Sequence, residues 1–370
     1  SEMVGLSSGT TGASPLNITN GTFKIMSMKN GHLQVDQNVT LDSGSAYDRV
    51  EFVSSSVTVD AGKTITGSNV LGRTAIGQRN DGTNNASMVV TNKGTITMQN
   101  GPRGNISSTA IAVETGKVLN DTGSKIQMTG EKAVAIYGAT NSDITNKGEI
   151  EIATKGTGIV GANSLERTGA ANQNITILND GKITGTAGEK VIGIYANNTH
   201  ATAVSKIKND TNGIIDLTAT KGSLGIYAGK SKLESKGDIN IGDENAGIMA
   251  TKSNVDINGG NYTLGKNSIG FILKDLNNTQ GYFNGASGTI NVNGKGTALY
   301  YMDGATLSTS VPASSAGKFN DSLTVNDAGI TVSPTDSVAY TYIYAKNSNL
   351  TYDKASPAGI TKDKVIFING

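Results

Sequence analysis

The feature that most constrains this chain is a pair of short phrases that return at nearly regular intervals. The first phrase joins small, aliphatic and large residues, as in VIGIYANN at 191–198, and the second joins a polar turn to an alternating strand, as in VTNKGTITM at 90–98. The turn residues of the second phrase lie 28, 26, 33, 30, 26, 23 and 26 positions apart: Asn92, Asn120, Asn146, Asn179, Asn209, Ser235, Asn258 and Asn284. A shared period in the twenties with variable insertions is typical of a solenoid.

The type of solenoid follows from the strands. They are short, they alternate with period two, and turns such as NDG and NKG separate them. No helical stripe with caps is present, which argues against leucine-rich, ankyrin and tetratricopeptide arrays, and propeller blades need a period of about 40 residues. The pattern predicts an all-β fold, a right-handed parallel β-helix (β-solenoid) of about a dozen coils.

Stacking of coils predicts an inward column and an outward column. Simple alternation puts Ile192 and Ile194 on one face, with Gly193 and Tyr195 on the other. The expected inward column is Ile111, Ile136, Ile159, Ile194, Ile226, Ile248, Phe271 and Leu299. The expected outward column is Ala112, Tyr137, Val160, Tyr195, Tyr227, Met249, Ile272, Tyr300 and Tyr344. Asn is expected at a tight corner, where it tolerates left-handed backbone and where stacked amides form a ladder.

The outward tyrosines are the candidate site residues, and two interpretations stay open for them. Covering insertions or ring stacking between coils would make them structural, whereas an exposed apolar stripe marks a binding surface. The candidate binding stripe consists of Tyr137, Tyr195, Tyr227, Tyr300 and Tyr344. A second group near the C-terminal end, Tyr340, Tyr342, Tyr344 and Tyr352, is open to the same two interpretations.

Composition narrows the function classes. The 370 residues carry a net charge of only +1 with 16% charged residues, which argues against nucleic acid or an anionic membrane as the main partner. The absence of Cys excludes disulfides, thiolate nucleophiles and Cys-based metal sites. No run of apolar residues is long enough for a membrane-spanning helix.

The predicted domain boundaries follow from where the repeated phrases are regular and where they are not. Residues 1–14 are expected to be a vector-derived start and a frayed N-terminal segment, and residues 15–370 a single parallel β-helix. Insertions interrupt the rhythm at 163–174, 197–206 and 303–321, with another at 78–87. Since recognition residues often lie on loops held by a rigid scaffold, 163–174 and 303–321 are the predicted contact loops.

The chain repeats NKG-I-x-I lines that alternate with G-I-Y-A lines, and it has no Cys, few charges and many Asn, Thr and Gly. In these features it resembles the passenger domain of a type V autotransporter. Over roughly residues 90–350, the order and spacing of these lines are similar to those in the large fusobacterial autotransporter adhesins. The resemblance implies an extracellular passenger on the surface of a Gram-negative bacterium, adhesion to other cells, and a role in virulence. In that family a signal peptide precedes the passenger and an outer-membrane β-barrel, not present here, anchors the parent chain. No binding residues carry over from the family.

Catalysis finds little support in the sequence. Enzymes on β-helices use clustered carboxylates or Asp with Ca²⁺, and the nearest groups here are Asp42 with Asp48 and Glu51, and Asp243 with Glu244. The two histidines, His32 and His200, are far apart, no G-x-S-x-G is present, and two histidines are too few for a His-cluster metal site. The expectation is no enzyme, no catalytic residues, no metal and no cofactor.

The sequence therefore favours an adhesin, a rigid rod that presents binding surfaces for bacterial or host cells. The expected partner is a surface protein or glycan, with no nucleic acid and no membrane insertion of this segment, and the expected state is a monomer. Two alternatives stay open: a polysaccharide-degrading enzyme on the same scaffold, or a phage-type fibre segment that trimerises along its apolar stripe.

Overall fold

The fold of the described residues consists of β-strands and turns, with no helix among them. The computed structural model describes residues 4–7, 16–17, 22–23, 26–29, 31–41, 50–53, 56–67, 72–78, 87–99, 101–162, 174–199, 205–330, 339–354, 359–360 and 364–369. Across these residues, no helix is long and apolar enough to cross a membrane. The all-β class predicted from the repeat is confirmed.

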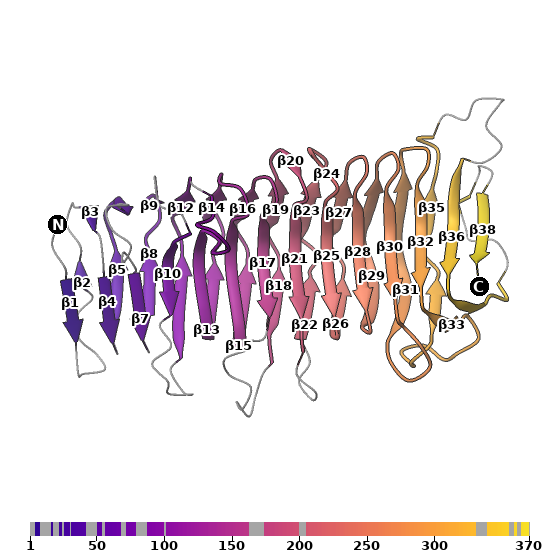
Figure 1. Ribbon diagram of the computed structural model, residues 1–370, viewed down its shortest axis with the longest axis horizontal. Helices are drawn as coiled ribbons and strands as arrows, with labels where there is room; N and C mark the ends of the chain where they lie inside the picture. Colours follow the sequence, from indigo (N-terminus) through magenta and orange to yellow (C-terminus); the bar gives the residue numbers. More distant parts are fainter. Residues whose placement is uncertain are drawn as a thin grey trace. The chain divides into compact units, whose positions relative to one another are not determined.

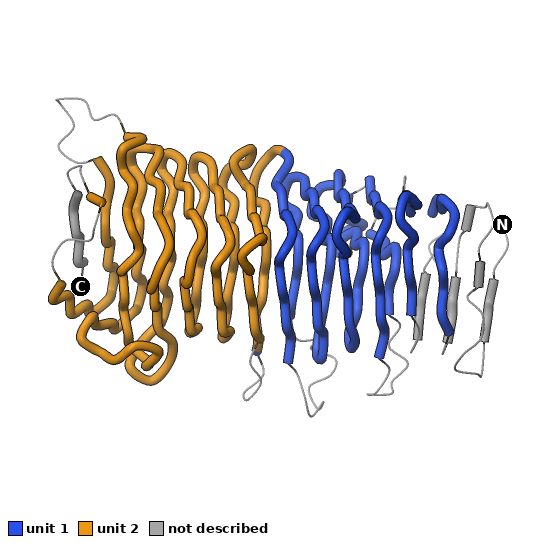
Figure 2. The backbone as a smooth tube through the Cα atoms, turned by 180° about the vertical axis from the view of Figure 1, so that it is seen from behind, with its two compact units in different colours: residues 1–186, 199–203 blue, residues 187–198, 204–370 orange. Residues whose placement is uncertain are grey.

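The chain divides into two compact units (Figure 2). Unit 1 comprises residues 1–186 and 199–203, and unit 2 comprises residues 187–198 and 204–370. The strand ladders within each unit are parallel and join strands one coil apart, which is the arrangement of a parallel β-helix. That residues 15–370 form a single β-helix stays a prediction.

Each coil of unit 1 has three strands, which we call faces A, B and C in chain order (Figure 1). The strands of face A are β1 (Val4–Ser7), β4 (Met26–Lys29), β7 (Val50–Val53), β10 (Thr74–Gln78), β17 (Thr157–Ala162), and the first parts of β13 (Thr109–Asn120) and β15 (Val134–Asn146). Those of face B are β2 (Leu16–Asn17), β5 (His32–Val35), β8 (Ser56–Val59), β11 (Met88–Asn92), β18 (Thr176–Asn179), and the last parts of β13 and β15. Those of face C are β3 (Thr22–Phe23), β6 (Val39–Leu41), β9 (Thr64–Gly67), β12 (Thr95–Met98), β14 (Lys125–Met128), β16 (Glu149–Ile152) and β19 (Lys182–Gly185).

Unit 2 repeats the same three faces. Face A contains β21 (Ile192–Asn197), β25 (Leu224–Gly229), β28 (Ala246–Thr251), β30 (Ile269–Lys274), β32 (Ala298–Asp303), β36 (Tyr340–Lys346) and β38 (Lys364–Asn369). Face B contains β22 (Ser205–Asn209), β26 (Ser231–Ser235), β34 (Phe319–Asp321), and the first parts of β29 (Asn254–Leu264) and β31 (Tyr282–Val292). Face C contains β23 (Ile214–Leu217), β27 (Asp238–Ile241), β35 (Thr324–Asn326), and the last parts of β29 and β31. Two short sheets pair β20 (Gly188–Glu189) with β24 (Thr220–Lys221), and β33 (Thr306–Ser308) with β37 (Asn349–Thr351).

The inward column of face A is largely the one predicted, with one correction. Ile226, Ile248 and Phe271 follow one another in register, but the next residue is Tyr300 rather than Leu299. Tyr300 is fully buried, and its ring lies 5.5 Å from that of Phe271. The prediction that Tyr300 points outward is therefore wrong, because two consecutive tyrosines leave the alternation ambiguous and the core takes the first one.

The strands of face A also depart from simple alternation of inward and outward side chains, as β21 shows at Gly193. Gly193 and Ile194 are both buried, while Ile192, predicted to face inward, is half-exposed. The ladder pairs Ile192 with Leu224 and Ile194 with Ile226, and passes over Gly193. A Cβ at Gly193 would lie 2.5 Å from the carbonyl oxygen of Gly225, so only glycine fits there. The alternation therefore shifts at this residue, so that Ile192 and Tyr195 point outward instead of Gly193 and Tyr195.

The corner between faces B and C holds the predicted asparagine ladder in unit 1. Asn92, Asn120, Asn146 and Asn179 are fully buried, and each of the first three donates its side-chain amide to the next at 2.8 Å. The corresponding column of unit 2 is different: Asn209 and Ser235 are followed by Ile257, Gly285 and Asp321. The prediction of Asn258 and Asn284 in this column is wrong, because β29 and β31 run through the corner with an irregular register.

Candidate functional site

The outer surface of face A in unit 2 is a candidate binding surface made of two columns. The outer column at the start of the strands contains Ile192, Leu224, Ala246, Ile269, Ala298 and Thr341. The second column, which we call the tyrosine stripe, contains Tyr195, Tyr227, Met249, Ile272, Tyr301 and Tyr344. All twelve side chains are half-buried, so together they form a continuous, largely apolar surface along six consecutive coils.

The rings of the tyrosine stripe stack on one another. The centroids of Tyr195 and Tyr227 are 4.8 Å apart with an interplanar angle of 11°, and those of Tyr301 and Tyr344 are 5.4 Å apart at 6°. Each ring covers one face of its neighbour, a geometry that stabilises the sheet. What the stripe offers to a partner is therefore ring edges and hydroxyl groups more than open ring faces.

The structure brings together three of the five predicted stripe residues, Tyr195, Tyr227 and Tyr344, and adds Tyr301, which the sequence pattern missed. Tyr137 lies in unit 1, in register with Ala112 and Val160. Its hydroxyl is partly shielded from water, and this burial together with the nearby Glu114 raises the pKa of Tyr137. Tyr137 thus sits between Ala112 and Val160, without an aromatic neighbour in register.

The predicted insertions all leave the coil at the same corner, between faces A and B. They separate β10 from β11, β17 from β18, β21 from β22, and β32 from β34. Residues 79–86, 163–173 and 200–204 of these insertions lie outside the described residues, and so does most of the first predicted contact loop. The corner that borders the tyrosine stripe is therefore the one at which the sequence varies in length.

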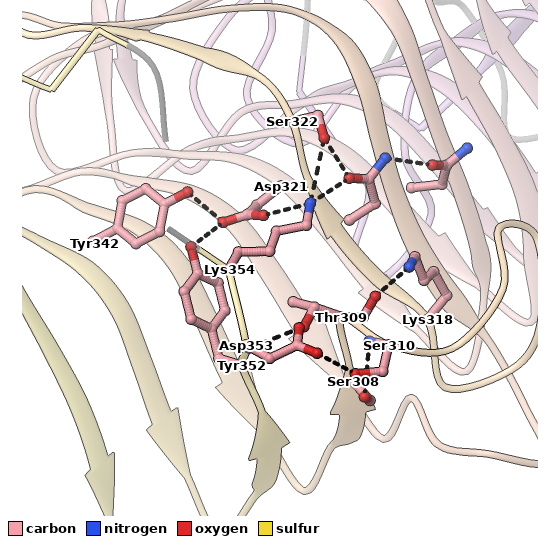
Figure 3. A network of polar contacts seen from close by, with 12 residues as sticks. Ser308, Thr309, Ser310, Lys318, Asp321, Ser322, Tyr342, Tyr352, Asp353 and Lys354 are labelled. Atoms are coloured by element: carbon pink, nitrogen blue, oxygen red, sulfur yellow. Dashed lines mark hydrogen bonds and ion pairs between the residues drawn. The ribbon is translucent and has the colours of Figure 1, made fainter. Parts of the chain in front are cut away.

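The insertion at 303–321 is held in place by polar contacts (Figure 3). Its strand β33 pairs with β37, and Thr309 and Ser310 both donate hydroxyl hydrogen bonds to the carboxylate of Asp353. The ammonium group of Lys318 donates to the carbonyl oxygen of Thr309. These bonds fix the second predicted contact loop against the segment that follows β37.

Next to it lies a buried carboxylate, Asp321, which is only 2% exposed. Its Oδ2 accepts hydrogen bonds from the hydroxyl groups of Tyr342 (2.6 Å) and Tyr352 (2.8 Å), and its Oδ1 lies 3.2 Å from Nζ of Lys354 (Figure 3). Burial, followed by the bond to Asp321, raises the pKa of Tyr352. Because these groups occupy the carboxylate, Asp321 acts as an anchor for three segments and is closed to a substrate.

The second tyrosine group is mostly structural. Tyr340 and Tyr342 are buried, and the Tyr340 hydroxyl donates to Asp327 at 3.0 Å. Of that group, Tyr344 alone belongs to the tyrosine stripe. Sequence reasoning missed the anchoring role of Asp321 and Asp327 because their tyrosine partners lie in later segments of the chain.

Of the two histidines weighed as acid–base candidates, His32 is the one whose contacts are described. Its Nδ1 lies 2.6 Å from Oγ of Ser56 and its Nε2 lies 3.0 Å from Oε1 of Gln34, while His200 lies outside the described residues. A serine–histidine pair needs backbone N–H donors for an oxyanion, but the N–H of Ser56 donates to the carbonyl of Gly31 within the sheet. The contacts fit a stack of polar side chains on face B.

The predicted acidic groups do not come together where the structure describes them. Asp243 accepts a hydrogen bond from the backbone N–H of Lys266, and Glu244 pairs with Lys221 at 3.6 Å. Asp42 and Asp48 lie outside the described residues, as does the side chain of Glu51. Within the described part of the chain, no three His, Cys, Asp or Glu side chains are grouped so as to hold a metal ion.

Comparison with known proteins does not identify the chain. No protein-family model, no curated protein and no solved structure matches it.

Proposed function

We propose that this chain is part of a bacterial cell-surface passenger that acts as an adhesin, holding a binding surface rather than turning over a substrate. The observation that carries the proposal is the pair of outer columns on face A in unit 2, in which eleven of the twelve half-buried side chains are apolar or Tyr. Single exposed apolar residues are normal on soluble proteins, but contiguous patches mark interaction sites.

The apolar character belongs to face A and not to the β-helix as a whole. The equivalent outer column of face C in unit 2 is polar throughout: Asp216, Asn240, Thr263, Asn291 and Asn326. If the outer surface only had to keep the chain in solution, the outer columns of face A and face C would both be polar. The difference supports a partner for face A, either a surface protein or a glycan on other bacterial or host cells.

Rigidity also supports recognition by surface contact. The stripe side chains stand on strands whose inward residues, such as Ile226, Ile248 and Phe271, are fully buried. A partner that docks on a preformed surface pays little conformational entropy for ordering it. Binding would then depend on shape, apolar contact and the tyrosine hydroxyl groups.

The test is binding of the purified chain to bacterial and host cells, with free sugars and amino acids as competitors. We expect saturable binding that drops at least about tenfold in a Tyr227→Lys/Ile272→Lys variant, because two charges would interrupt the apolar surface. The matched control, Asn240→Lys/Asn291→Lys, adds the same charges to the polar column of face C and should bind like the wild type.

Three results would overturn the proposal. A folded chain that binds no cells would be a stalk, and release of sugar chain ends from polysaccharides would favour the alternative enzyme. A stable trimer in sedimentation that the Tyr227→Lys/Ile272→Lys variant dissociates would favour the phage-type fibre, with face A as its seam.

A further inference from the structure

The corner between faces A and B of unit 2 carries a concentration of lysines beside the tyrosine stripe. We call this set the lysine ridge: Lys206, Lys230, Lys232, Lys252, Lys274 and Lys346. Five of the six are exposed and Lys274 is half-buried. Among the described residues of this corner, Asp275 directly follows Lys274, and Asp303 lies in register between Lys274 and Lys346. The whole chain has a net charge of +1, which conceals this concentration of lysines.

Three other lysines of unit 2 have carboxylate partners. Lys208 pairs with Asp210 at 2.9 Å, Lys236 with Glu234 at 3.0 Å, and Lys221 with Glu244 at 3.6 Å. No carboxylate of the described residues lies within ion-pair distance of a ridge ammonium group. The charges of Lys230, Lys232 and Lys252, which are exposed, are therefore directed at solvent.

In the first part of the ridge, lysines recur from one coil to the next. Lys206 and Lys232 are in register one coil apart, and the corner residues Lys230 and Lys252 occupy one position in successive coils. One coil advances by about 4.8 Å along the stack. A row of like charges at such a spacing complements a flexible chain that carries a negative charge on each repeating unit.

We infer that the lysine ridge binds a linear acidic polysaccharide, carrying sulfate or carboxylate groups, that lies along the corner beside the tyrosine stripe. This inference rests on the proposed adhesive function and names the partner class of the same surface. Single-stranded nucleic acid is a poorer fit, because it needs open aromatic faces for base stacking, and here Tyr195 and Tyr227 cover one another.

Equivalent positions in other coils show which substitutions remove lysine charges without disturbing the fold. Lys230 and Lys252 have positive φ angles of 47° and 50°, and Asn347 occupies the same corner position with φ 48°. Asn tolerates this conformation better than Lys does. At the position of Lys232, the next coil has Asn254 in register. A Lys230→Asn/Lys232→Asn/Lys252→Asn variant therefore places at each position a residue that the fold already accepts there.

The matched control removes three lysines from the opposite corner of the coil, between faces C and A. It is Lys190→Asn/Lys221→Gln/Lys266→Gln, in which Lys190 also has a positive φ, of 56°, and Asn267 has the same conformation at the equivalent corner. Both variants lower the net charge by three. A difference between them reports the position of the charges and not their number.

The experiment measures binding of the whole chain to immobilised heparin, a sulfated polymer, and to polygalacturonate, which carries carboxylates alone, with neutral dextran as a blank. We expect binding to at least one acidic polymer, weakened by added salt, with a loss of roughly tenfold or more in the ridge variant and little change in the control. Binding to one polymer alone would say whether sulfate or carboxylate is the preferred group.

Equal losses in both variants, or no binding to either polymer, would overturn the inference. Tighter binding to duplex DNA or to an acidic protein such as polyglutamate would also overturn it, by assigning the ridge to another partner. Cell binding by the wild-type chain that neither polymer inhibits would refute the inference and leave the adhesin standing. Polymer binding without cell binding would refute the adhesin alone.

Discussion

At the scale of single residues, the buried amide ladder of unit 1 shows how one side chain serves two neighbours. Asn120 accepts a hydrogen bond from Asn92 and donates one to Asn146, both at 2.8 Å, and also accepts one from the hydroxyl of Ser124. Asn92 begins the ladder, since the residue in register one coil earlier is Val59. We predict that Asn120→Val lowers the free energy of unfolding by about 2–4 kcal/mol, because it leaves buried polar atoms on both sides without partners.

The same substitution at the start of the ladder is the control. Asn92→Val removes the acceptor of the Gly94 N–H but leaves the Ser124 hydroxyl as a donor to Asn120, and it extends the Val59 column, so it should cost clearly less than Asn120→Val. Urea unfolding followed by circular dichroism measures both. Equal costs at the two positions would mean that the amides act independently and not as a ladder.

A second prediction at this scale concerns alkaline pH. The Tyr282 hydroxyl donates to Oδ2 of Asp256 at 2.8 Å, and burial, reinforced by that carboxylate, raises the pKa of Tyr282 to about 12 from its ordinary value of 10.0. A raised pKa in the folded state means that stability is complete below pH about 10 and falls as pH rises through about 12. We predict that Asp256→Asn shifts the titration of Tyr282 to lower pH.

The ultraviolet absorbance of tyrosinate follows this titration, and a Tyr282→Phe variant identifies which part of the signal belongs to Tyr282. Removal of the Asp256 charge should make the Tyr282 signal begin at lower pH, since the anion no longer faces a carboxylate. An unchanged titration would show that burial alone sets the pKa.

At the scale of elements, the repeated phrases predicted the strands well, and the failures occur where repetition stops. Equivalent positions in successive coils face the same way, so the Asn corner and the aliphatic column could be read from spacing alone. The phrase GTALYYM could not show which of two adjacent tyrosines, Tyr300 or Tyr301, faces the core. The lysine ridge did leave a signal, because Lys230 and Lys252 each directly follow a copy of the phrase, but its meaning depends on knowing that this position is an exposed corner.

Asp321 escaped prediction because it joins elements that are distant in sequence. It receives hydrogen bonds from Tyr342 on β36 and Tyr352 after β37, and it pairs with Lys354. We predict that Asp321→Asn costs about 2–4 kcal/mol, because an amide cannot neutralise the ammonium group and accept both hydroxyl groups. Urea unfolding measures the loss, and hydrogen exchange should show faster exchange at 349–354.

Glu244→Gln provides the comparison for that variant. Glu244 forms an exposed pair with Lys221 at 3.6 Å, and such surface pairs contribute about 0–1 kcal/mol. If Asp321→Asn were as mild as Glu244→Gln, or if exchange at 349–354 did not change, the buried carboxylate would not anchor this segment.

At the scale of the molecule, a parallel β-helix behaves as a stack in which each coil contacts its neighbours, so whole coils should be removable and fractions of coils should not. Residues 230–251 make up one coil of unit 2, from the corner residue Lys230 to the end of β28. Their removal joins Gly229 to Lys252 and brings Ile226 of β25 into the position below Phe271 of β30, which keeps the inward column continuous.

We predict that the variant lacking 230–251 folds with a β-type circular dichroism spectrum and resists protease, whereas a variant lacking only 230–240 does not. The shorter deletion joins face A directly to the end of face C, so one coil loses face B and the corner that follows it, and the ladders on both sides of that coil lose their pairing. Equal protease resistance in both variants would contradict a stack of equivalent coils. Equal sensitivity would mean that the deleted coil makes contacts that its neighbours cannot replace, and the hydrogen bond from Tyr262 to Ser235 would be the first to examine.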